Sequence, residues 1–230
     1  MFEVEDLCAW YGQAQAVRNV SLNVQPGELV TLVGRNGAGK TTVLHCIMGL
    51  HPHVSGRISL NGADVSGWPA HRRARAGLGY VPDDRGIYAS LTVEENLLLP
   101  PAVGPGPWSL SRVYGMFPAL QARRRFPGNK LSGGEQQMLA IARVLRMGAQ
   151  VLLLDEPTEG LAPVLVQQVA EILREVKAQG LTILLVEQNL RFATALADRH
   201  YLLSEGQIVE TMDNRQVIER EEELLEHLGV

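Results

Sequence analysis

The sequence predicts an α/β fold with a parallel sheet at its centre, and three observations support this prediction. The runs 29–33, 151–154 and 182–186 are almost entirely apolar and have the length of buried strands. Helix-like patterns separate them, which favours a parallel sheet covered on both faces. A glycine-rich turn follows the first run and two carboxylates follow the second, so polar groups gather where parallel strands end.

Composition limits the function classes that fit. The chain has 230 residues, of which 46% are hydrophobic and 20% are charged, as in a globular protein with one sizeable core. The net charge of −4 disfavours a strongly basic nucleic-acid binder, so we expect no nucleic-acid partner. No stretch of about 18 apolar residues occurs, so any membrane role must come through a partner.

The two cysteines, Cys8 and Cys46, do not form a disulfide framework pattern. Cys46 lies in the apolar run 43–50, which predicts a buried, reduced thiol. The first residues lack a basic segment followed by an apolar one, so they do not resemble a secretory signal.

The amino-terminal elements alternate between strands and turns. Residues 2–33 show the two-residue alternation of strands and predict an N-terminal antiparallel β-subdomain. A helix is expected from about Thr41 to Met48, stopped near Gly49. Residues 57–60 predict another strand, which the Asn61-Gly62 turn ends.

The middle of the chain differs from the rest in its amino-acid composition. Prolines and glycines are concentrated at 100–107, and helical patterns flank them. We interpret this part as a helical subdomain at about 84–146, inserted into a single domain 1–230, with the 100–107 stretch as a loop over it. A helix is expected from Ser132 to about Met147.

The carboxyl-terminal part returns to the α/β pattern. We expect helices at 163–179 and 189–197, a hairpin around 204–206 and a terminal helix at 214–228. The apolar residues expected to face inward from that terminal helix are Val217, Ile218, Leu224, Leu225 and Leu228.

Residues 34–41 match the phosphate-binding pattern G-x-x-x-x-G-K-[ST], between a predicted strand and a predicted helix. Its glycines let backbone N–H groups turn toward phosphates, and the helix N-terminus adds positive potential. Lys40 would contact the β- and γ-phosphates, and the Thr41 hydroxyl would bind Mg²⁺. The residues predicted to contact ATP in this segment are Gly34, Arg35, Asn36, Gly37, Ala38, Gly39, Lys40, Thr41 and Thr42. The alternative is a glycine-rich turn without a ligand.

Asp155 and Glu156 end the apolar run 151–154. At the carboxyl end of a parallel strand both acids would face the phosphate-binding turn. Asp155 would hold Mg²⁺, through water, and Glu156 would polarise the attacking water. Adjacent residues in a strand point to opposite sides, which suits two separate roles. The alternative is a pair of solvated acids at a turn.

Residues 131–135 read LSGGE. Ser132 and Glu135 predict a capping box at the start of an apolar helix. A capping box does not require Gly133 and Gly134, which weaken a helix by up to about 1 kcal/mol each. Glycines at these positions would let a phosphate approach the helix N-terminus.

With this segment the sequence resembles the ABC ATPases, whose signature is LSGGQ or LSGGE, and the resemblance covers nearly the whole chain in the right order. It implies a P-loop NTPase fold, ATP and Mg²⁺ as ligands, and a working dimer of ATPase subunits. In that family the signature of one subunit covers the γ-phosphate on the P-loop of the other. The residues that carry this implied role are Leu131, Ser132, Gly133, Gly134 and Glu135.

Further positions follow from the resemblance. Tyr11 falls where the family stacks an aromatic ring on adenine, and a core tyrosine is the alternative. Asp83 stands in the glutamine loop, near Mg²⁺, where most members have Gln. Ala162 stands in the D-loop where Asp is usual, and Gln188 in the switch loop where His is usual.

These departures suggest a hypothesis about activity. Gln188 cannot titrate as a histidine could at the γ-phosphate, Asp83 adds charge near the metal, and Ala162 removes a polar contact across the dimer. The site on this subunit's own P-loop would be attenuated, and its signature would serve a site on a non-identical ATPase. The family pattern leaves a homodimer open as well.

Residues 80–85, 158–163 and 186–189 resemble one subgroup, the LivF-like ATPases of bacterial branched-chain amino acid importers, which usually carry Glu at position 83. The resemblance implies a second ATPase, two transmembrane permeases and, indirectly, a periplasmic binding protein. It places the chain peripherally on the cytoplasmic face of the inner membrane. A permease helix would dock in the groove near 83–96.

Other assignments fit parts of the sequence. Importers of urea or short amides share much of the pattern. A lipopolysaccharide-export ATPase is a third alternative, disfavoured by the missing histidine. A non-transport ABC ATPase is a fourth, disfavoured because the chain has one P-loop, one signature and no heptad run. The exact solute stays open.

Two arginine clusters remain. We interpret them as solvated helix faces, with contact to acidic loops of a partner as the alternative. Their members are Arg72, Arg73, Arg75, Arg123, Arg124 and Arg125.

Overall fold

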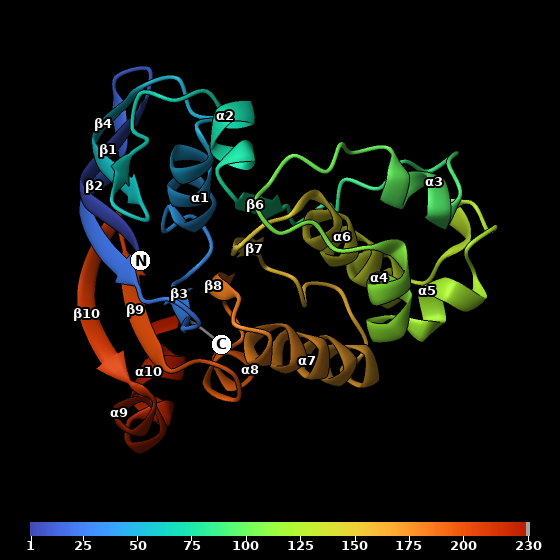
Figure 1. The fold of residues 1–230 in the computed structure, drawn as a ribbon. Coiled ribbons are helices and arrows are strands. Elements are labelled where there is room, and N and C mark those ends of the chain that lie inside the picture. Colours follow the sequence, from blue (N-terminus) through green and yellow to red (C-terminus); the bar gives the residue numbers. More distant parts are fainter. Residues whose placement is uncertain (229–230) are drawn as a thin grey trace.

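The computed structural model describes residues 1–228 and contains two sheets with helices between and beside them (Figure 1). The strands are β1 (Phe2–Tyr11), β2 (Ala14–Val24), β3 (Leu29–Val33), β4 (Val54–Leu60), β5 (Ala63–Asp64), β6 (Leu78–Val81), β7 (Val151–Asp155), β8 (Thr182–Glu187), β9 (Arg199–Ser204) and β10 (Gln207–Asp213). The helices are α1 (Lys40–Met48), α2 (Ala70–Arg75), α3 (Val93–Leu98), α4 (Leu110–Met116), α5 (Pro118–Ala122), α6 (Gly133–Met147), α7 (Pro163–Ala178), α8 (Leu190–Thr194), α9 (Asn214–Glu219) and α10 (Glu221–Leu228).

The sheet topology confirms the predicted fold class. The amino-terminal strands form an antiparallel sheet in the order β2-β1-β4-β5. The second sheet has the order β10-β9-β3-β8-β7-β6, in which all neighbours are parallel except the edge strand β10. Crossover helices join the parallel strands, which is why their sequences are apolar on both faces.

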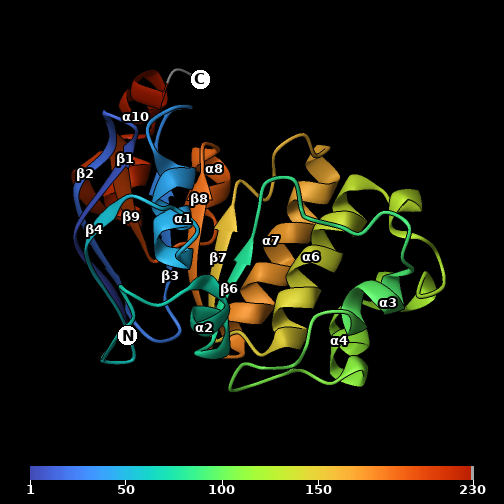
Figure 2. The same ribbon diagram turned by 90° about the horizontal axis from the view of Figure 1, so that it is seen from above.

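Helix α1 lies between the two sheets, and α6 and α7 cover the opposite face of the six-stranded sheet (Figure 2). One apolar cluster joins the antiparallel sheet, α1 and one face of the core sheet, with Phe2, Leu44 and Ile47 fully buried. A second cluster joins the other face to α6, α7 and the helical segments α3 to α5. Burial of such side chains contributes about 1.5–3 kcal/mol each, so α1 is fixed from both sides.

Both cysteines are buried, and Cys46 lies in the cluster around α1 as predicted. Burial raises the pKa of the Cys46 thiol to about 12, with the Arg73 charge acting weakly in the opposite direction. Cys8 donates its thiol to Asn19 Oδ1 at 3.1 Å. The Cys46 side chain is therefore a thiol at neutral pH.

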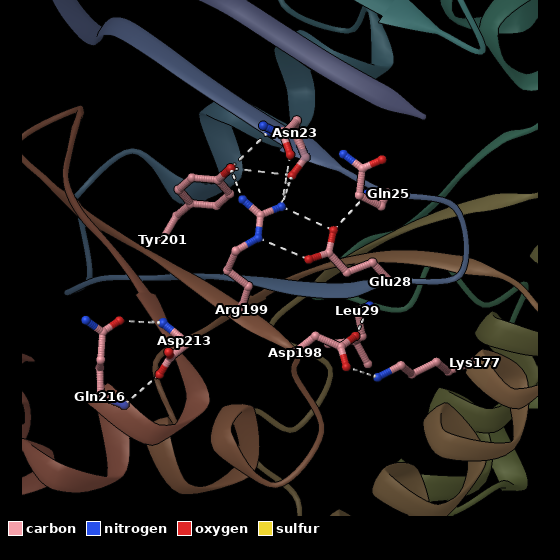
Figure 3. Close-up of polar contacts among 10 residues, drawn as sticks. All are labelled: Asn23, Gln25, Glu28, Leu29, Lys177, Asp198, Arg199, Tyr201, Asp213 and Gln216. Atoms are coloured by element: carbon pink, nitrogen blue, oxygen red, sulfur yellow. Dashed lines mark hydrogen bonds and ion pairs between the residues drawn. The ribbon is translucent and has the colours of Figure 1, made fainter.

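Polar contacts join the two sheets where β9 begins (Figure 3). The Arg199 guanidinium donates to Glu28 Oε1 at 3.0 Å and to the Asn23 carbonyl at 2.8 Å. The Asp198 carboxylate accepts from the Leu29 amide at 2.9 Å. Because Leu29 opens β3, this cluster fixes the start of the strand that leads into the glycine-rich turn.

The proline- and glycine-rich stretch packs against the end of α6. The amides of Val103 and Gly104 donate to the Met147 carbonyl. A Cβ at Gly104 would lie 2.4 Å from the Gly148 carbonyl oxygen, so only glycine permits this approach. The stretch therefore satisfies carbonyls that the end of α6 leaves free.

The predicted terminal helix is wrong in one respect, because the chain forms two helices that meet at Arg220. Arg220 has φ −118°, and its guanidinium bonds to Glu210 and Glu223. Within α9, Val217 is buried, whereas Ile218 points away from the core and is 60% exposed, contrary to expectation. Leu224 and Leu228 are buried and Leu225 is partly buried, as expected.

Arg73 contradicts the interpretation of the first arginine cluster as a solvated face. Its side chain is buried and donates to the carbonyls of Ser66, Trp68, Cys46 and Ile47. The last two carbonyls belong to the final turn of α1, where a cation also complements the helix dipole.

None of the helices in residues 1–228 has the length and apolar character needed to cross a bilayer.

Candidate active site

A cavity of about 710 Å³ opens at the carboxyl ends of β3 and β7, where ligands bind in open α/β sheets. The glycine-rich turn and α1 form one wall, and β2 with the β9–β10 turn forms another. Its lining residues are Tyr11, Gln15, Ala16, Arg18, Asn36, Gly37, Gly39, Lys40, Thr41, Thr42, Asp83, Asp155, Glu156, Glu159, Glu205 and Gly206.

The turn between β3 and α1 requires glycine at particular places. Gly37 and Gly39 have φ of 82° and 103°, which side chains rarely adopt. A Cβ at Gly34 would lie 2.5 Å from the Leu203 carbonyl oxygen, so the neighbouring strand β9 excludes any larger residue. Helix α1 begins at Lys40, and its free N–H groups therefore face the cavity.

Lys40 is 4% exposed, and its ammonium is held from three sides. It donates to the carbonyls of Gly34 at 2.8 Å and Arg35 at 3.1 Å, and it forms an ion pair with Glu156 Oε1 at 3.0 Å. A fixed, desolvated cation at the mouth of a helix N-terminus is suited to bind phosphate.

Asp155 is fully buried at the end of β7, and both of its oxygens accept hydrogen bonds. Thr41 Oγ1 donates to Oδ1 at 3.1 Å, and the Tyr80 hydroxyl donates to Oδ2 at 3.1 Å. His45 Nε2 lies 3.2 Å from the Tyr80 hydroxyl and extends the chain of contacts. Burial raises the pKa of Asp155, and its hydrogen bonds oppose that change.

The donor set around Asp155 fits Mg²⁺ in one particular way. Thr41, Asp155 and the exposed Asp83 offer hard oxygen atoms in one cavity. Across residues 1–228 no cluster of three His, Cys, Asp or Glu side chains could hold a metal alone. A site with so few protein oxygens suits Mg²⁺, which keeps several waters and is also bound by substrate phosphates. It does not suit a metal that protein groups enclose completely.

Glu156 lies just outside β7 and has a φ of 41°. The expectation that the two acids point apart through strand alternation is therefore wrong. A left-handed turn separates them instead, and it directs Glu156 to Lys40 while Asp155 faces Thr41. Left-handed backbone at a non-glycine residue is costly and is concentrated at functional positions.

Tyr11 is 57% exposed at the cavity edge, so the alternative of a core tyrosine is wrong. Its hydroxyl lies 3.4 Å from Thr42 Oγ1, and its ring centroid lies 4.6 Å from that of His51. The open face of the ring is available for stacking on a base.

The glycine-rich turn divides its residues between two hollows. Asn36, Gly37 and the residues from Gly39 onward line the cavity described above. Arg35 and Ala38 line another hollow of about 670 Å³, which Asn36 and Gly37 also border. Gly34 packs against Leu203.

Gln188 lies in a separate cavity of about 420 Å³, which shares Glu156 and Glu159 with the first but contains no residue of the glycine-rich turn. Beside it, Glu187 is 2% exposed, and burial raises its pKa to about 7. Gln188 and Glu156 therefore border the same cavity.

The LSGGE segment stands apart from both cavities, at the amino end of α6. Ser132 and Glu135 form the predicted capping box, with the Glu135 amide donating to Ser132 Oγ at 3.3 Å. A Cβ at Gly134 would lie 2.8 Å from Leu165 Cδ2, so a larger residue here would displace the Leu165 side chain of α7. Gly133 is partly exposed and has only side-chain ends near it.

Comparison with known proteins decides the family. Residues 17–159 match the family model described as ABC transporter, which is more than half of the chain. The chain belongs to the ABC transporter family. As an ABC transporter ATPase it binds nucleotide and is an ATP hydrolase, as the resemblance predicted.

Individual relatives support this assignment. The chain is 41% identical over 216 residues to the high-affinity branched-chain amino acid transport ATP-binding protein BraG of Pseudomonas aeruginosa, covering 91% of each chain. It is 34% identical to the lipopolysaccharide export system ATP-binding protein LptB of Haemophilus influenzae, covering 98% of this chain and 95% of LptB. The solved ATP-binding cassette MJ1267 of an ABC transporter has the same fold, with a TM-score of 0.87, 23% identity, and coverage of 100% of this chain and 97% of that one.

Several residues of this ABC ATPase site were not singled out from the sequence. Arg18 comes from β2 and Glu205 from the β9–β10 turn, and neither position carries a motif. Tyr80 and Glu187 lie in the segments 80–85 and 186–189, which carried a family resemblance but assigned no role to either residue. Glu187 carries one signal, a polar side chain directly after the predicted buried strand 182–186, whereas no strand was predicted around Tyr80.

Proposed function

We propose that the chain is the ATP-hydrolysing subunit that energises an ABC importer for branched-chain amino acids. The observation that carries the ATP chemistry is the convergence of Lys40, Thr41, Asp155 and Glu156 at the ends of β3 and β7. The 41% identity to BraG, over nearly the whole of both chains, supports the solute class.

Each wall of the main cavity has a proposed role in binding ATP. Tyr11 stacks on adenine, and the residues 34–42 surround the phosphates with backbone N–H groups and Lys40. Thr41 and Asp155 hold Mg²⁺ with Asp83 beside them, and the metal supplies charge stabilisation for the phosphoryl group when bound.

Glu156 is the proposed base that polarises the attacking water. Glu156 forms an ion pair with Lys40. When a bound phosphate attracts the Lys40 ammonium, this ion pair breaks and the Glu156 carboxylate is free to contact water. Gln188 is the proposed switch-loop residue and lies near Glu156 in the adjoining cavity. Together these contacts link phosphate binding to activation of the water.

Completion of the site requires a second ATPase subunit in this proposal. The residues Leu131 to Glu135 lie outside the cavity that the P-loop lines, so they act on ATP held by a partner. The partly exposed Gly133 and the free N–H groups of α6 form an anion-binding end of a long helix.

The helical segment between β6 and β7 is the proposed contact with two membrane permeases, in the groove near residues 83–96. It carries exposed apolar side chains, which contact with a permease would bury. These are Tyr88, Leu98, Leu99 and Phe126, each about half exposed. Such docking places the chain on the cytoplasmic face of the inner membrane, with a periplasmic binding protein delivering the solute.

The alternatives differ in the solute and in the direction of transport. Importers of urea or short amides share the sequence pattern, and LptB matches nearly the full length of the chain at lower identity than BraG. The higher identity to BraG favours import of branched-chain amino acids.

The test is uptake of radiolabelled leucine, isoleucine and valine by cells that lack this chain and are complemented with the wild-type protein. Restored uptake of these solutes, but not of urea or acetamide, is the expected result. Restored urea uptake, or an outer-membrane defect in place of an uptake defect, contradicts the assignment.

Purification of the tagged chain from detergent-solubilised membranes gives the partners independently. Two hydrophobic permeases and a distinct ATPase are expected in the mass spectrum. Recovery of the chain alone, or with ribosomal proteins, contradicts the importer assignment while leaving the ATP chemistry intact.

A further inference from the structure

Glu187 is a buried carboxylate at the end of the central strand β8. Its backbone pairs with Val33 of β3, and the preceding Val186 pairs with Asp155 of β7. It therefore lies between the strand that leads into the P-loop and the strand that carries the acids. Within residues 1–228 no lysine or arginine forms an ion pair with it. Burial of a carboxylate without a cation lowers stability, so its presence requires an explanation.

Both oxygens of Glu187 accept hydrogen bonds, and the two donors belong to different loops. Thr158 Oγ1 donates to Oε1 at 2.8 Å, and the Asn189 amide donates to Oε2 at 3.3 Å. Thr158 follows Glu156 by two residues, and Asn189 directly follows Gln188. One side chain therefore joins the loop that carries the proposed base to the switch loop.

The backbone holds the same two loops at a second point. The Glu156 amide donates to the Val186 carbonyl at 3.0 Å, which leaves Glu156 in its left-handed conformation. Movement of either loop would break a contact to β8. The positions of Glu156 and Gln188 are coupled by these contacts.

We propose that Glu187 is a positioning residue for ATP hydrolysis, which fixes Glu156 and Gln188 relative to each other through its two hydrogen bonds. This inference rests on the proposed role of Glu156 and adds a residue to it. Glu187 does not line the cavity formed by the P-loop, so its loss is expected to lower kcat and to leave ATP affinity intact.

The test compares substitutions on both sides of the contact in the full-length chain, assembled with its partner ATPase and permeases. Glu187→Ala removes both acceptors and is expected to lower kcat about tenfold or more, because small misplacements of reacting groups are costly. Thr158→Val removes one donor at nearly constant volume and is expected to lower kcat about three- to tenfold. The double variant should be no worse than Glu187→Ala, since both changes break one connection.

Glu187→Gln tests whether the contacts matter more than the charge. The amide can accept from the Asn189 N–H and donate to the Thr158 hydroxyl, so it is expected to restore kcat to within about threefold of wild type. Thr31→Val is the matched control, because Thr31 is fully buried and its hydroxyl lies 2.6 Å from His200 Nδ1, away from both loops. The Kd for a fluorescent ATP analogue should stay within about twofold in every variant.

Hydrogen exchange gives a readout that does not depend on hydrolysis. The Asn189 amide should exchange at least about tenfold faster in Glu187→Ala, whereas the strand β8 stays protected. Unchanged exchange, unchanged kcat, or an equal loss of kcat in Glu187→Gln overturns the positioning role. A Glu156→Gln variant that hydrolyses ATP at the wild-type rate contradicts the proposed function, and the exchange measurement still decides the role of Glu187.

Discussion

The P-loop end of the sheet and the amino end of α6 differ in how their polar groups are used. At the P-loop, Lys40 pairs with Glu156 and Thr41 donates to Asp155, and both Lys40 and Asp155 are buried. At α6, Ser132 and Glu135 bond to each other, and the partly exposed Gly133 presents the helix end outward. The polar groups of the first region bond within the chain, and the second leaves a helix end that we propose acts on a partner subunit. Substitutions of Glu156 in the first region and of Gly133 in the second are therefore both expected to lower ATP hydrolysis while ATP binding by the single chain persists.

The largest expected effect is that of Glu156→Gln in the P-loop region. Loss of the proposed base should lower ATP hydrolysis at least about 100-fold, while ATP binding persists. The measurement is phosphate release together with the Kd of a fluorescent ATP analogue. Glu171→Gln on the exposed face of α7 is the control and should hydrolyse at the wild-type rate. Equal rates for the two variants would remove Glu156 from the mechanism.

Gly133→Asp tests the other region. The aspartate should lower hydrolysis by roughly 10- to 100-fold, because like charges about 4 Å apart repel by a few kcal/mol near a protein surface. It should also raise stability by about 0.3–1 kcal/mol, since an acid in the first helical turn complements the dipole. Calorimetry measures the expected gain in stability, and phosphate release measures the expected loss of ATP hydrolysis.

Gly134→Ala provides the contrast to Gly133→Asp. Its Cβ would lie 2.8 Å from Leu165, so it should lower the unfolding temperature.

ATP affinity of the single chain should not change with Gly133→Asp. A parallel fall in affinity would mean that the signature acts on ATP within its own chain.

Tyr80→Phe should weaken the metal site of the P-loop region. It removes the hydroxyl that donates to Asp155 Oδ2, and loss of such a supporting contact costs about tenfold in metal affinity. Titration of Mn²⁺ into the nucleotide complex by electron paramagnetic resonance measures this directly. Tyr114→Phe is the control, because its hydroxyl donates to Glu94 at 2.9 Å in the helical segment. The same metal affinity in both variants would argue against an orienting role for Tyr80.

The smallest effect is expected for Gln188→His, which tests the attenuated-site hypothesis. A histidine can add a charged contact to the γ-phosphate, so the ATPase rate of the assembled complex should rise by about threefold. Gln168→His on the exposed surface of α7 serves as the control. An unchanged or lower rate with Gln188→His would count against attenuation.

Local patterns were sufficient to predict the strands β3, β7 and β8, the P-loop turn and the capping box at Ser132, whereas β5 and β6 were not predicted. Each of these features depends on residues close together in the sequence, and each has a local signal: an apolar run, a glycine spacing or the S-x-x-E pattern. The left-handed turn at Glu156 could not be predicted, because it is set by the amide bond to Val186 on another strand. The burial of Arg73 depends likewise on the carbonyl end of α1, which is distant in sequence. The break at Arg220 depends on Glu210 of β10.

The two sulfur atoms give the protein a practical property. Thiol reagents attack the thiolate, so Cys46, buried and with its pKa near 12, and Cys8, bonded to Asn19, should both react slowly. A cysteine introduced at an exposed site such as Ile218 or Leu98 should therefore be labelled selectively without removal of either native residue. A fluorophore pair at these two positions would report, on single molecules, whether the helical segment moves relative to the carboxyl-terminal helices when ATP is added.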